Sequence, residues 1–229
     1  MSGEIRVNWR QISLLVFIAS IGVVTAGILR EVFLFLFGAQ TRFSDLRFFN
    51  LNAERTLGAW YTSSLLLMCA LLLLVAALDV RRHRARHQAL WFLLAVGFLF
   101  LSFDESAEFH ETLNFLVPAE YRTGPFLFAW VIFGAAGVGL LGLVYFRFLA
   151  DLNPRTRLFF LLSGGIYVAG AVVMEMVGGE IATGLGQSHL LYIAAYCIEE
   201  GLEIAGVSLF LAALLDYLAR RPGPLTLRF

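Results

Sequence analysis

The chain has 229 residues, of which 59% are hydrophobic, 15% are charged and none is lysine. A soluble domain usually carries about a quarter charged residues, so this composition predicts an integral membrane protein. The lack of lysine excludes a retinal or pyridoxal Schiff base and a phosphate-loop lysine, and the net charge of zero gives no indication of a nucleic-acid partner. The two cysteines, Cys69 and Cys197, lie in apolar runs and are expected to be free thiols.

Six apolar segments are each long enough to cross a bilayer as a helix, which takes about 20 residues. They cover residues 12–37, 59–79, 90–117, 125–149, 158–181 and 190–218. Turn-forming residues such as Pro118 and Asn153-Pro154 separate them. The sequence therefore predicts an all-α integral membrane protein, a six-helix bundle forming one domain over 1–229. The aromatic and charged segment 39–58 is expected at the outer interface, as a re-entrant or amphipathic cap.

The distribution of arginine predicts the orientation of the bundle. If the N-terminus is cytoplasmic, twelve of the 17 arginines fall on the inner side of the membrane and five on the outer side. Cytoplasmic segments of membrane proteins are enriched in arginine and lysine. Both termini are therefore expected in the cytoplasm, and a bacterial inner (plasma) membrane is the expected location.

Acidic side chains are concentrated in three of the six predicted spans, where charge is least tolerated. Nine of the 17 acidic residues lie there: Asp104, Glu105, Glu108 and Glu111 in 90–117, Glu175 and Glu180 in 158–181, and Glu199, Glu200 and Glu203 in 190–218. At a rise of about 1.5 Å per residue, all three groups fall in the outer half of the bilayer. We therefore expect them to form one intramembrane cluster.

Helical periodicity adds detail to this cluster. If 90–117 is one continuous helix, Asp104, Glu108 and Glu111 occupy one narrow stripe. His110 and Asn114 extend the polar arc beside that stripe. A single face of the last helix carries Tyr192, Tyr196, Glu199 and Glu203, with Glu200 beside it.

Basic side chains at this depth are too few to neutralise the acids, since only His110 and the rim arginines Arg30, Arg55 and Arg122 are available. Carboxylates in a low dielectric must be paired, protonated, hydrated or bound to a cation. We expect a bound cation, either a divalent metal ion or a proton. Oxygen ligands favour Ca²⁺, Mg²⁺ or Mn²⁺, whereas one added imidazole suits Mn, Fe or Zn. The Glu-x-x-His motif of di-iron bundles does not occur.

Small residues predict where helices approach closely. The pairs Ala135/Gly139 and Gly165/Ala169 have the spacing of close helix contacts, and Gly178-Gly179 is expected to unwind the end of the fifth helix. The pattern acid-Glu-x-x-Glu occurs at 104–108 and again at 199–203, which leaves an inverted repeat as an open interpretation.

Three functions remain open. The surplus of acid favours a cation transporter or channel, which is the leading hypothesis. The apolar run GVSLFLAALL (206–215), which offers no polar path to the inner side, favours a metal-dependent membrane enzyme acting on a lipid-like substrate. The third is a non-catalytic subunit or receptor whose acidic pocket takes an organic cation. The expected partners are the lipid bilayer and the cation, and a homo-oligomer is left open.

Overall fold

The computed structural model describes residues 8–38 and 46–221, which form helices and loops and no strand. Six helices in this part of the chain are long and apolar enough to span a membrane, which confirms the predicted number. They are α1 (Trp9–Phe37), α2 (Leu57–Arg82), α3 (Gln88–Ala107), α5 (Trp130–Asp151), a continuous helix from Pro154 to Leu185, and α8 (Leu190–Ala219). The continuous helix comprises α6 (Pro154–Val168), the π-helical segment η5 (Ala169–Met174) and α7 (Glu175–Leu185).

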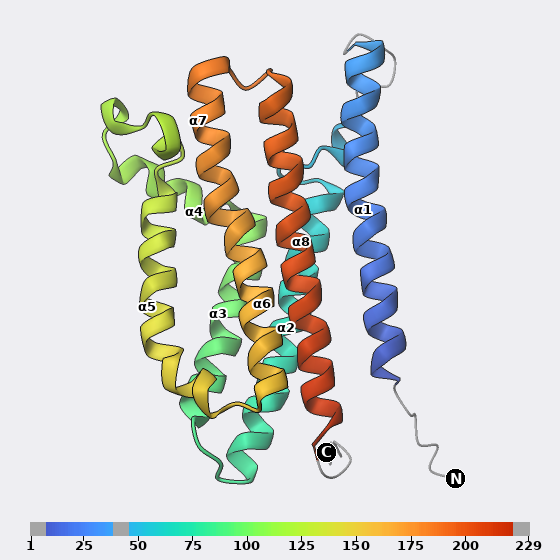
Figure 1. Ribbon diagram of the computed structural model, residues 1–229, viewed down its shortest axis with the longest axis vertical. Coiled ribbons are helices and arrows are strands. Elements are labelled where there is room, and N and C mark those ends of the chain that lie inside the picture. The colour runs from blue at the N-terminus through green and yellow to red at the C-terminus, as the bar shows by residue number, and fades with distance from the viewer. Residues whose placement is uncertain (1–7, 39–45, 222–229) are drawn as a thin grey trace.

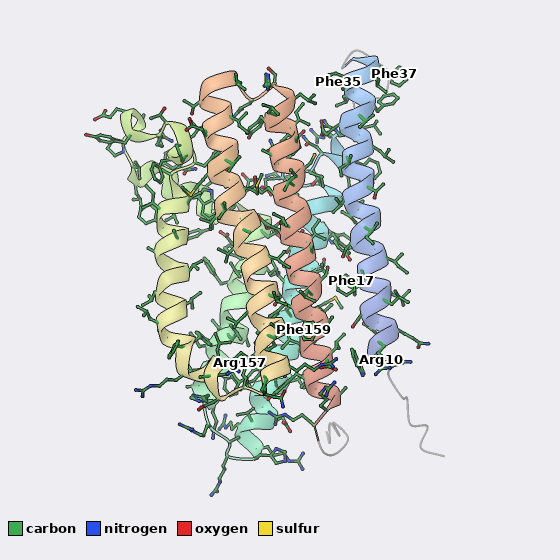
Figure 2. The ribbon with its side chains drawn as sticks, in the orientation of Figure 1. Arg10, Phe17, Phe35, Phe37, Arg157 and Phe159 are labelled. Carbon is green, nitrogen blue, oxygen red and sulfur yellow. The ribbon has the colours of Figure 1, made fainter. Side chains whose placement is uncertain are left out.

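Successive spans run in opposite directions (Figure 1). We call the end where α1, α3 and α6 begin the lower end, and the opposite end the upper end, as they stand in Figure 1. Figure 2 shows Arg10 and Arg157 at the lower end and Phe35 and Phe37 at the upper end. Short helices connect the spans at the upper end: η1 (Leu46–Phe49), α4 (Phe109–Thr112), η2 (Leu113–Leu116), η3 (Ala119–Tyr121) and η4 (Gly124–Phe126).

Polar side chains fix where several helices begin. Each accepts a hydrogen bond from a backbone N–H of the first turn, which that turn otherwise leaves without a partner. The pairs are Asn8 with Arg10, Thr56 with Ala59, Asn153 with Arg155 and His189 with Leu191. Glycines end two helices with a left-handed backbone, Gly38 after α1 (φ 75°) and Gly186 after α7 (φ 89°).

Helix α8 is the central helix of the bundle, and it packs against α1, α2, α6, η5 and α7. The main apolar core lies beside it and extends to the lower end, with members Leu65, Leu66, Leu73, Trp91, Phe148, Phe160, Leu211 and Leu214. Trp91 stacks on Tyr217 and meets Phe148 edge to face. Helix α5 lies at the side of the bundle (Figure 1). Both cysteines are free, as expected.

The third helix is shorter than predicted, because it ends at Ala107 rather than continuing to 117. Glu108 adopts a left-handed backbone (φ 53°), and its N–H closes the last turn on the Asp104 carbonyl at 2.8 Å. The chain then turns into the separate short helix α4. The predicted stripe of Asp104, Glu108 and Glu111 on one continuous helix face is therefore wrong.

The fourth span also begins later than predicted, at Trp130 instead of 125, because residues 124–126 form a 3₁₀ turn. The Asn114 side chain caps this helix, since its Oδ1 accepts the Trp130 N–H at 2.8 Å. The end of the fifth span is not unwound at Gly178-Gly179, which stay helical within α7. The irregular segment is instead η5, which ends immediately before Glu175.

The described part of the predicted outer segment, residues 46–58, packs into the side of the bundle. Leu51 is buried against Gly27 of α1, where a side chain on the glycine would collide with it. Gly27 lies ten residues below the upper end of α1, which corresponds to about 15 Å along a helix. This arrangement fits a re-entrant segment, and it carries the following residues, including Glu54, down beside the other helices. Residues 39–45 lie outside the described part.

Helices approach closely at two glycines that lie outside the predicted pairs Ala135/Gly139 and Gly165/Ala169. A Cβ on Gly206 of α8 would lie 2.7 Å from the Tyr167 backbone nitrogen and 2.9 Å from the Ser163 carbonyl. A Cβ on Gly170 of η5 would lie 2.8 Å from the Glu199 carbonyl. A Cβ on Gly165 or Gly139, by contrast, would meet no neighbouring atom within 4 Å. The tightest contact is therefore backbone to backbone between α6–η5 and α8.

We expect Gly206→Ala to lower the free energy of unfolding by about 1–3 kcal/mol, because the added methyl group meets backbone atoms that cannot move aside. Denaturant unfolding of the purified protein in detergent measures this. Gly165→Ala is the matched control, with open space around the new Cβ and a better helix former in place of glycine. Equal losses in the two variants would contradict the proposed contact.

Candidate functional site

Serine side chains fix how α2 and α3 pair near the upper end. Ser63 Oγ donates to the Ser102 carbonyl at 2.7 Å, and Ser102 Oγ donates to the Ser63 carbonyl at 2.8 Å. Ser106 Oγ adds a bond to Ser63 Oγ at 2.8 Å. Because the two helices are antiparallel, this register brings the residues that precede α2 alongside the end of α3 and α4. Glu54 thereby comes close to the acidic residues of the third span.

Asp104 holds the break between α3 and α4 together. One carboxylate oxygen accepts the His110 backbone N–H at 2.7 Å, and the other lies 3.0 Å from His110 Nδ1. The His110 ring also packs against Trp130, with ring centroids 4.7 Å apart. Asp104 is thus the member of the predicted set that is satisfied by a backbone amide and a histidine.

Acidic side chains from four parts of the chain lie within electrostatic range of one another. We call this set the acidic cluster: Glu54, Asp104, Glu105, Glu108, Glu111, Glu175, Glu199, Glu200 and Glu203. The pairs that join the elements include Glu200 with Glu105 and Glu54, and Glu203 with Glu105 and Glu175. The structure thus brings together eight of the nine carboxylates that the sequence analysis singled out.

Glu180, the ninth predicted carboxylate, lies elsewhere. Its Oε2 faces Gly124 in η4, 2.8 Å from where a Cβ on that glycine would stand. It is exposed, and it is not among the electrostatic partners of Glu54, Glu105, Glu199, Glu200 or Glu203. Glu180 follows Glu175 by five residues on α7, which turns it away from the face that Glu175 presents to α8.

Within the acidic cluster, the side chains of Glu175 and Glu199 lie within hydrogen-bonding range of each other. Two features bring them together. Gly170 lets η5 approach the α8 backbone at Glu199, and the π-helical turn ends immediately before Glu175. Trp130 Nε1 also donates to Glu175 Oε1 at 3.4 Å. Short π-helical segments often occur at functional sites, which is consistent with this placement.

The predicted supporting residues separate into different roles. Tyr192 is within electrostatic range of Glu175 and Glu199, and its hydroxyl donates to Asn52 Oδ1 at 3.5 Å. Tyr196 instead bonds to Glu31 of α1, which forms an ion pair with Arg30. Asn114 caps α5, as described above.

Sequence reasoning missed one member of the acidic cluster, Glu54, and one neighbour of it, Tyr167. Tyr167 of α6 is within electrostatic range of Glu203 and Glu105. Nothing in the sequence around it distinguishes it from other tyrosines at helix positions. The position of Glu54 could have been predicted from the sequence. Glu54 precedes the second predicted helix, and the start of that helix lies beside the end of the third helix if the two are antiparallel.

The surroundings of Glu54 raise the pKa of its carboxyl group. Partial burial of the carboxyl, followed by the negative charges of Glu108 and Glu111, raises the pKa of Glu54 to about 7, although His110 opposes the shift. His110 also has a raised pKa. Burial lowers it, but the hydrogen bond to Asp104 and the charges of Asp104, Glu111 and Glu175 outweigh that effect.

The described arginines do not neutralise the acidic cluster. Arg30 is paired with Glu31, and neither Arg55 nor Arg122 is an electrostatic partner of Glu54, Glu105, Glu199, Glu200 or Glu203. Within residues 8–38 and 46–221, no group of three or more His, Cys, Asp or Glu side chains is arranged to hold a metal ion. The metal ion expected from the sequence therefore stays a prediction.

Hydroxyl groups continue below the acidic cluster, where the sequence suggested an uninterrupted apolar region. Ser20 Oγ lies 2.8 Å from Ser208 Oγ and 2.9 Å from the Tyr61 hydroxyl, and so links α1, α2 and α8. Ser208 follows Glu203 by five residues, about 7 Å further toward the lower end. The hydroxyl of Thr62, next to Tyr61, is buried and has no hydrogen-bond partner among the described residues.

The fold and this site define a polytopic helical protein with six helices suited to a membrane and a group of acidic side chains between them. A family model described as "Domain of unknown function (DUF8692)" matches residues 12–218, and the chain belongs to this family. No curated protein and no solved structure matches the chain. The family description names no activity, so the function has to be argued from the site.

The raised pKa of Glu54 predicts a pH dependence of stability. Between about pH 4.5 and 7 the folded protein keeps the Glu54 proton whereas the unfolded chain releases it, so this residue makes stability fall as pH rises. Glu54→Gln should weaken that fall in this window, as measured by unfolding in detergent at several pH values. The exposed Glu120→Gln serves as the control and should keep the wild-type slope. An unchanged slope in Glu54→Gln would contradict the assignment.

Asp104→Asn should lower the pKa of His110, because the substitution removes the negative charge that bonds to Nδ1. NMR titration of the ring-labelled histidines reports this directly. The resonance of His83, which lies beyond the end of α2 near Asp79, is the control and should not be changed by the substitution. A His110 pKa that does not fall would show that Asp104 is not its controlling partner.

Proposed function

We propose that the protein binds a cation at the acidic cluster and moves it across the membrane, and that this cation is the proton. The contact that supports the proton best is the one between the Glu175 and Glu199 carboxyl groups, which lie within hydrogen-bonding range of each other. Ionised carboxylates only accept hydrogen bonds, so a bond between two carboxyl groups requires a proton on one of them. The pair is therefore suited to hold a proton that either carboxyl can release.

The charge balance of the site supports the same proposal. Ionised carboxylates without partners are costly away from water, and such residues inside membrane proteins commonly mark ion or proton pathways. His110 is the one basic side chain among the named electrostatic partners of the described cluster members. Cations or protons from outside the chain have to neutralise the rest, which is the property required of a cation-binding site.

The hydroxyl groups below the cluster supply part of a route. A hydroxyl both donates and accepts hydrogen bonds, so the set of Ser208, Ser20 and Tyr61 can pass a proton along. On this proposal the proton enters from the upper end, occupies the Glu175–Glu199 pair and continues toward the lower end. The excess of arginine at the lower end makes that end cytoplasmic by the positive-inside rule, in a bacterial plasma membrane.

One observation favours a second function, a metal-dependent membrane enzyme acting on a lipid-like substrate. A histidine that binds a metal usually has its other ring nitrogen held by a carboxylate or a carbonyl, as Asp104 holds Nδ1 of His110. The Nε2 atom would then face the metal, with nearby cluster carboxylates such as Glu111 as oxygen ligands. Elemental analysis separates the two functions, because this one requires a transition metal that Glu108→Gln and Glu203→Gln both lose.

Proton flux into proteoliposomes tests the leading proposal, with a pH-sensitive dye inside and a membrane potential as the driving force. We expect wild-type protein to conduct protons, and Glu199→Gln and Glu175→Gln to reduce the flux by roughly a hundredfold, the scale on which a positioned proton-transfer group acts. Tyr61→Phe should reduce it as well, because it removes a hydroxyl below the cluster.

Glu180→Gln is the matched control, since it removes a carboxylate of the same helix that lies outside the acidic cluster. Its flux should equal that of the wild type. Absence of flux in the wild type, or equal flux in Glu199→Gln and Glu180→Gln, would overturn the proposal. Circular dichroism and gel filtration of each variant distinguish loss of the fold from loss of transport.

A further inference from the structure

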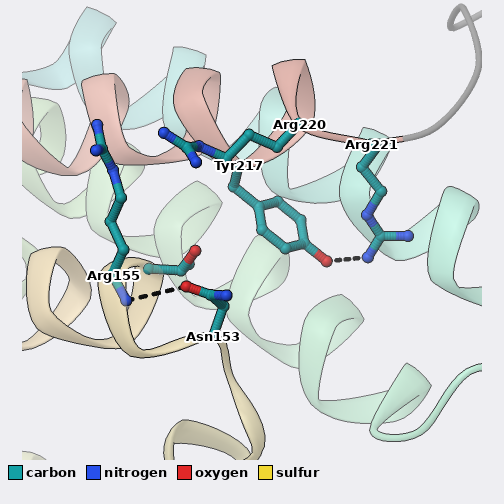
Figure 3. Close-up of a pocket in the computed structure, with 6 residues that line it drawn as sticks. Asn153, Arg155, Tyr217, Arg220 and Arg221 are labelled. Atoms are coloured by element: carbon teal, nitrogen blue, oxygen red, sulfur yellow. Dashed lines mark hydrogen bonds between the residues drawn. The ribbon is translucent and has the colours of Figure 1, made fainter.

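A cavity at the lower end combines several groups suited to an anion. It has a volume of about 310 Å³ and is lined by Asn153, Arg155, Thr156, Tyr217, Arg220 and Arg221. Figure 3 shows the residues of α6 on one side of the cavity and those at the end of α8 on the other. Three arginines and no acidic residue are among the lining residues. A second cavity of about 430 Å³ shares Tyr217 and Arg221 with it.

Two of the arginines have donors to spare. Arg155 and Arg220 both donate through Nε to the same oxygen of Asp216, at 3.1 and 3.0 Å. No bond from their terminal Nη groups to a described residue accompanies these contacts, and about half of each side chain is exposed (52% and 56%). Two positive charges thus share one buried carboxylate, which leaves a net charge of +1 and free guanidinium donors at the cavity.

The third arginine stiffens the cavity rather than adding free charge. Arg221 is paired with Asp79 of α2, and it also donates to the Tyr217 hydroxyl. Tyr217 in turn stacks on Trp91 of the core. The cavity wall is therefore anchored to α2, α3 and α8, which keeps the arginines in place without a ligand.

The start of α6 adds a favourable field. The continuous helix from Pro154 to Leu185 begins at this cavity, with Asn153 as its N-cap and Pro154 in its first turn. Pro154 has no N–H and Arg155 donates its own to Asn153, so this helix start attracts an anion through its dipole. Arginines that offer parallel N–H donors bind phosphate with the same geometry as carboxylate.

The position of the cavity indicates which phosphate it takes. It lies at the ends of membrane-length helices, at the level expected for lipid headgroups. Above Arg155 on the same face of α6 are Leu158 and Leu162, whose exposed fractions are 54% and 46%. A phosphate in the cavity would therefore place attached acyl chains along an exposed apolar helix face. Basic pockets between transmembrane helices on the cytoplasmic side are known to bind anionic headgroups.

We propose that the cavity formed by Arg155, Arg220 and the start of α6 binds the phosphate of an anionic phospholipid headgroup. Arg155 and Arg220 supply Nη donors to the phosphate oxygens while Asp216 holds their Nε atoms. This site is separate from the acidic cluster near the upper half of the bundle and does not depend on the transport proposal.

Native mass spectrometry of the delipidated full chain in detergent tests the site, with phosphatidylglycerol and phosphatidylcholine of identical acyl chains as probes. Phosphatidylglycerol should bind more tightly than phosphatidylcholine. Arg155→Gln and Arg220→Gln should each weaken that binding about fivefold, the effect expected for one arginine near anionic lipid. Arg147→Gln, an exposed arginine at the same end but outside the cavity, is the control and should change nothing.

If an arginine variant does not fold, Asp216→Asn still tests the proposal, because the proposal predicts the opposite result for this substitution. Removing the shared carboxylate raises the net charge of the cavity, so phosphatidylglycerol should bind more tightly. Equal binding of the two lipids, or an equal loss in Arg147→Gln, would overturn the proposal. Inorganic phosphate provides a further test. If it raises the melting temperature as much as phosphatidylglycerol does, and if Arg155→Gln abolishes both effects equally, the site takes a soluble anion and the proposal is overturned.

Discussion

The organisation of the upper half of the bundle depends on the electrostatic free energy of carboxyl groups held away from water. The surrounding apolar helices disfavour ionised groups, yet α3, α7, α8 and the segment before α2 all place acidic side chains in the same region. Such a concentration is stable only if protons or cations accompany it. Asp104 meets this requirement with His110 inside the chain, whereas Glu175 and Glu199 would meet it by sharing a proton in the function proposed above.

Backbone irregularities, rather than regular helix faces, assemble this region. The left-handed Glu108 ends α3, so that Asp104 and His110 fold onto each other. The π-helical η5 and Gly170 bring Glu175 onto α8, and Leu51 against Gly27 brings the exposed Glu54 within electrostatic range of Glu105 and Glu200. Each departure from regular structure occurs next to an acidic residue. The lower half, where the helices are regular, contains the apolar core instead.

The sequence was sufficient for the features that follow from composition and length. Long apolar runs predicted all six long helices, and depth along each helix predicted which acids come together. The sequence was not sufficient where a single backbone angle determines whether a helix continues or ends. Nothing in the residues around Glu108 requires φ to become positive, so a continuous helix was the natural expectation. Glu180 was included for its depth alone, and its position around α7, five residues after Glu175, placed it at Gly124 instead.

The π-helical segment accommodates one residue more than a regular helix would hold over the same rotation. If the six residues Ala169–Met174 followed regular α-helical geometry instead, everything beyond them would be rotated by about 100° relative to α6, which would separate Glu175 from Glu199. Loss of one residue between 169 and 174 would let the segment return to a regular helix while Glu175 keeps its direction. The paired acids therefore tolerate a fifth span that is one residue shorter, but not the full-length span without its π-turn.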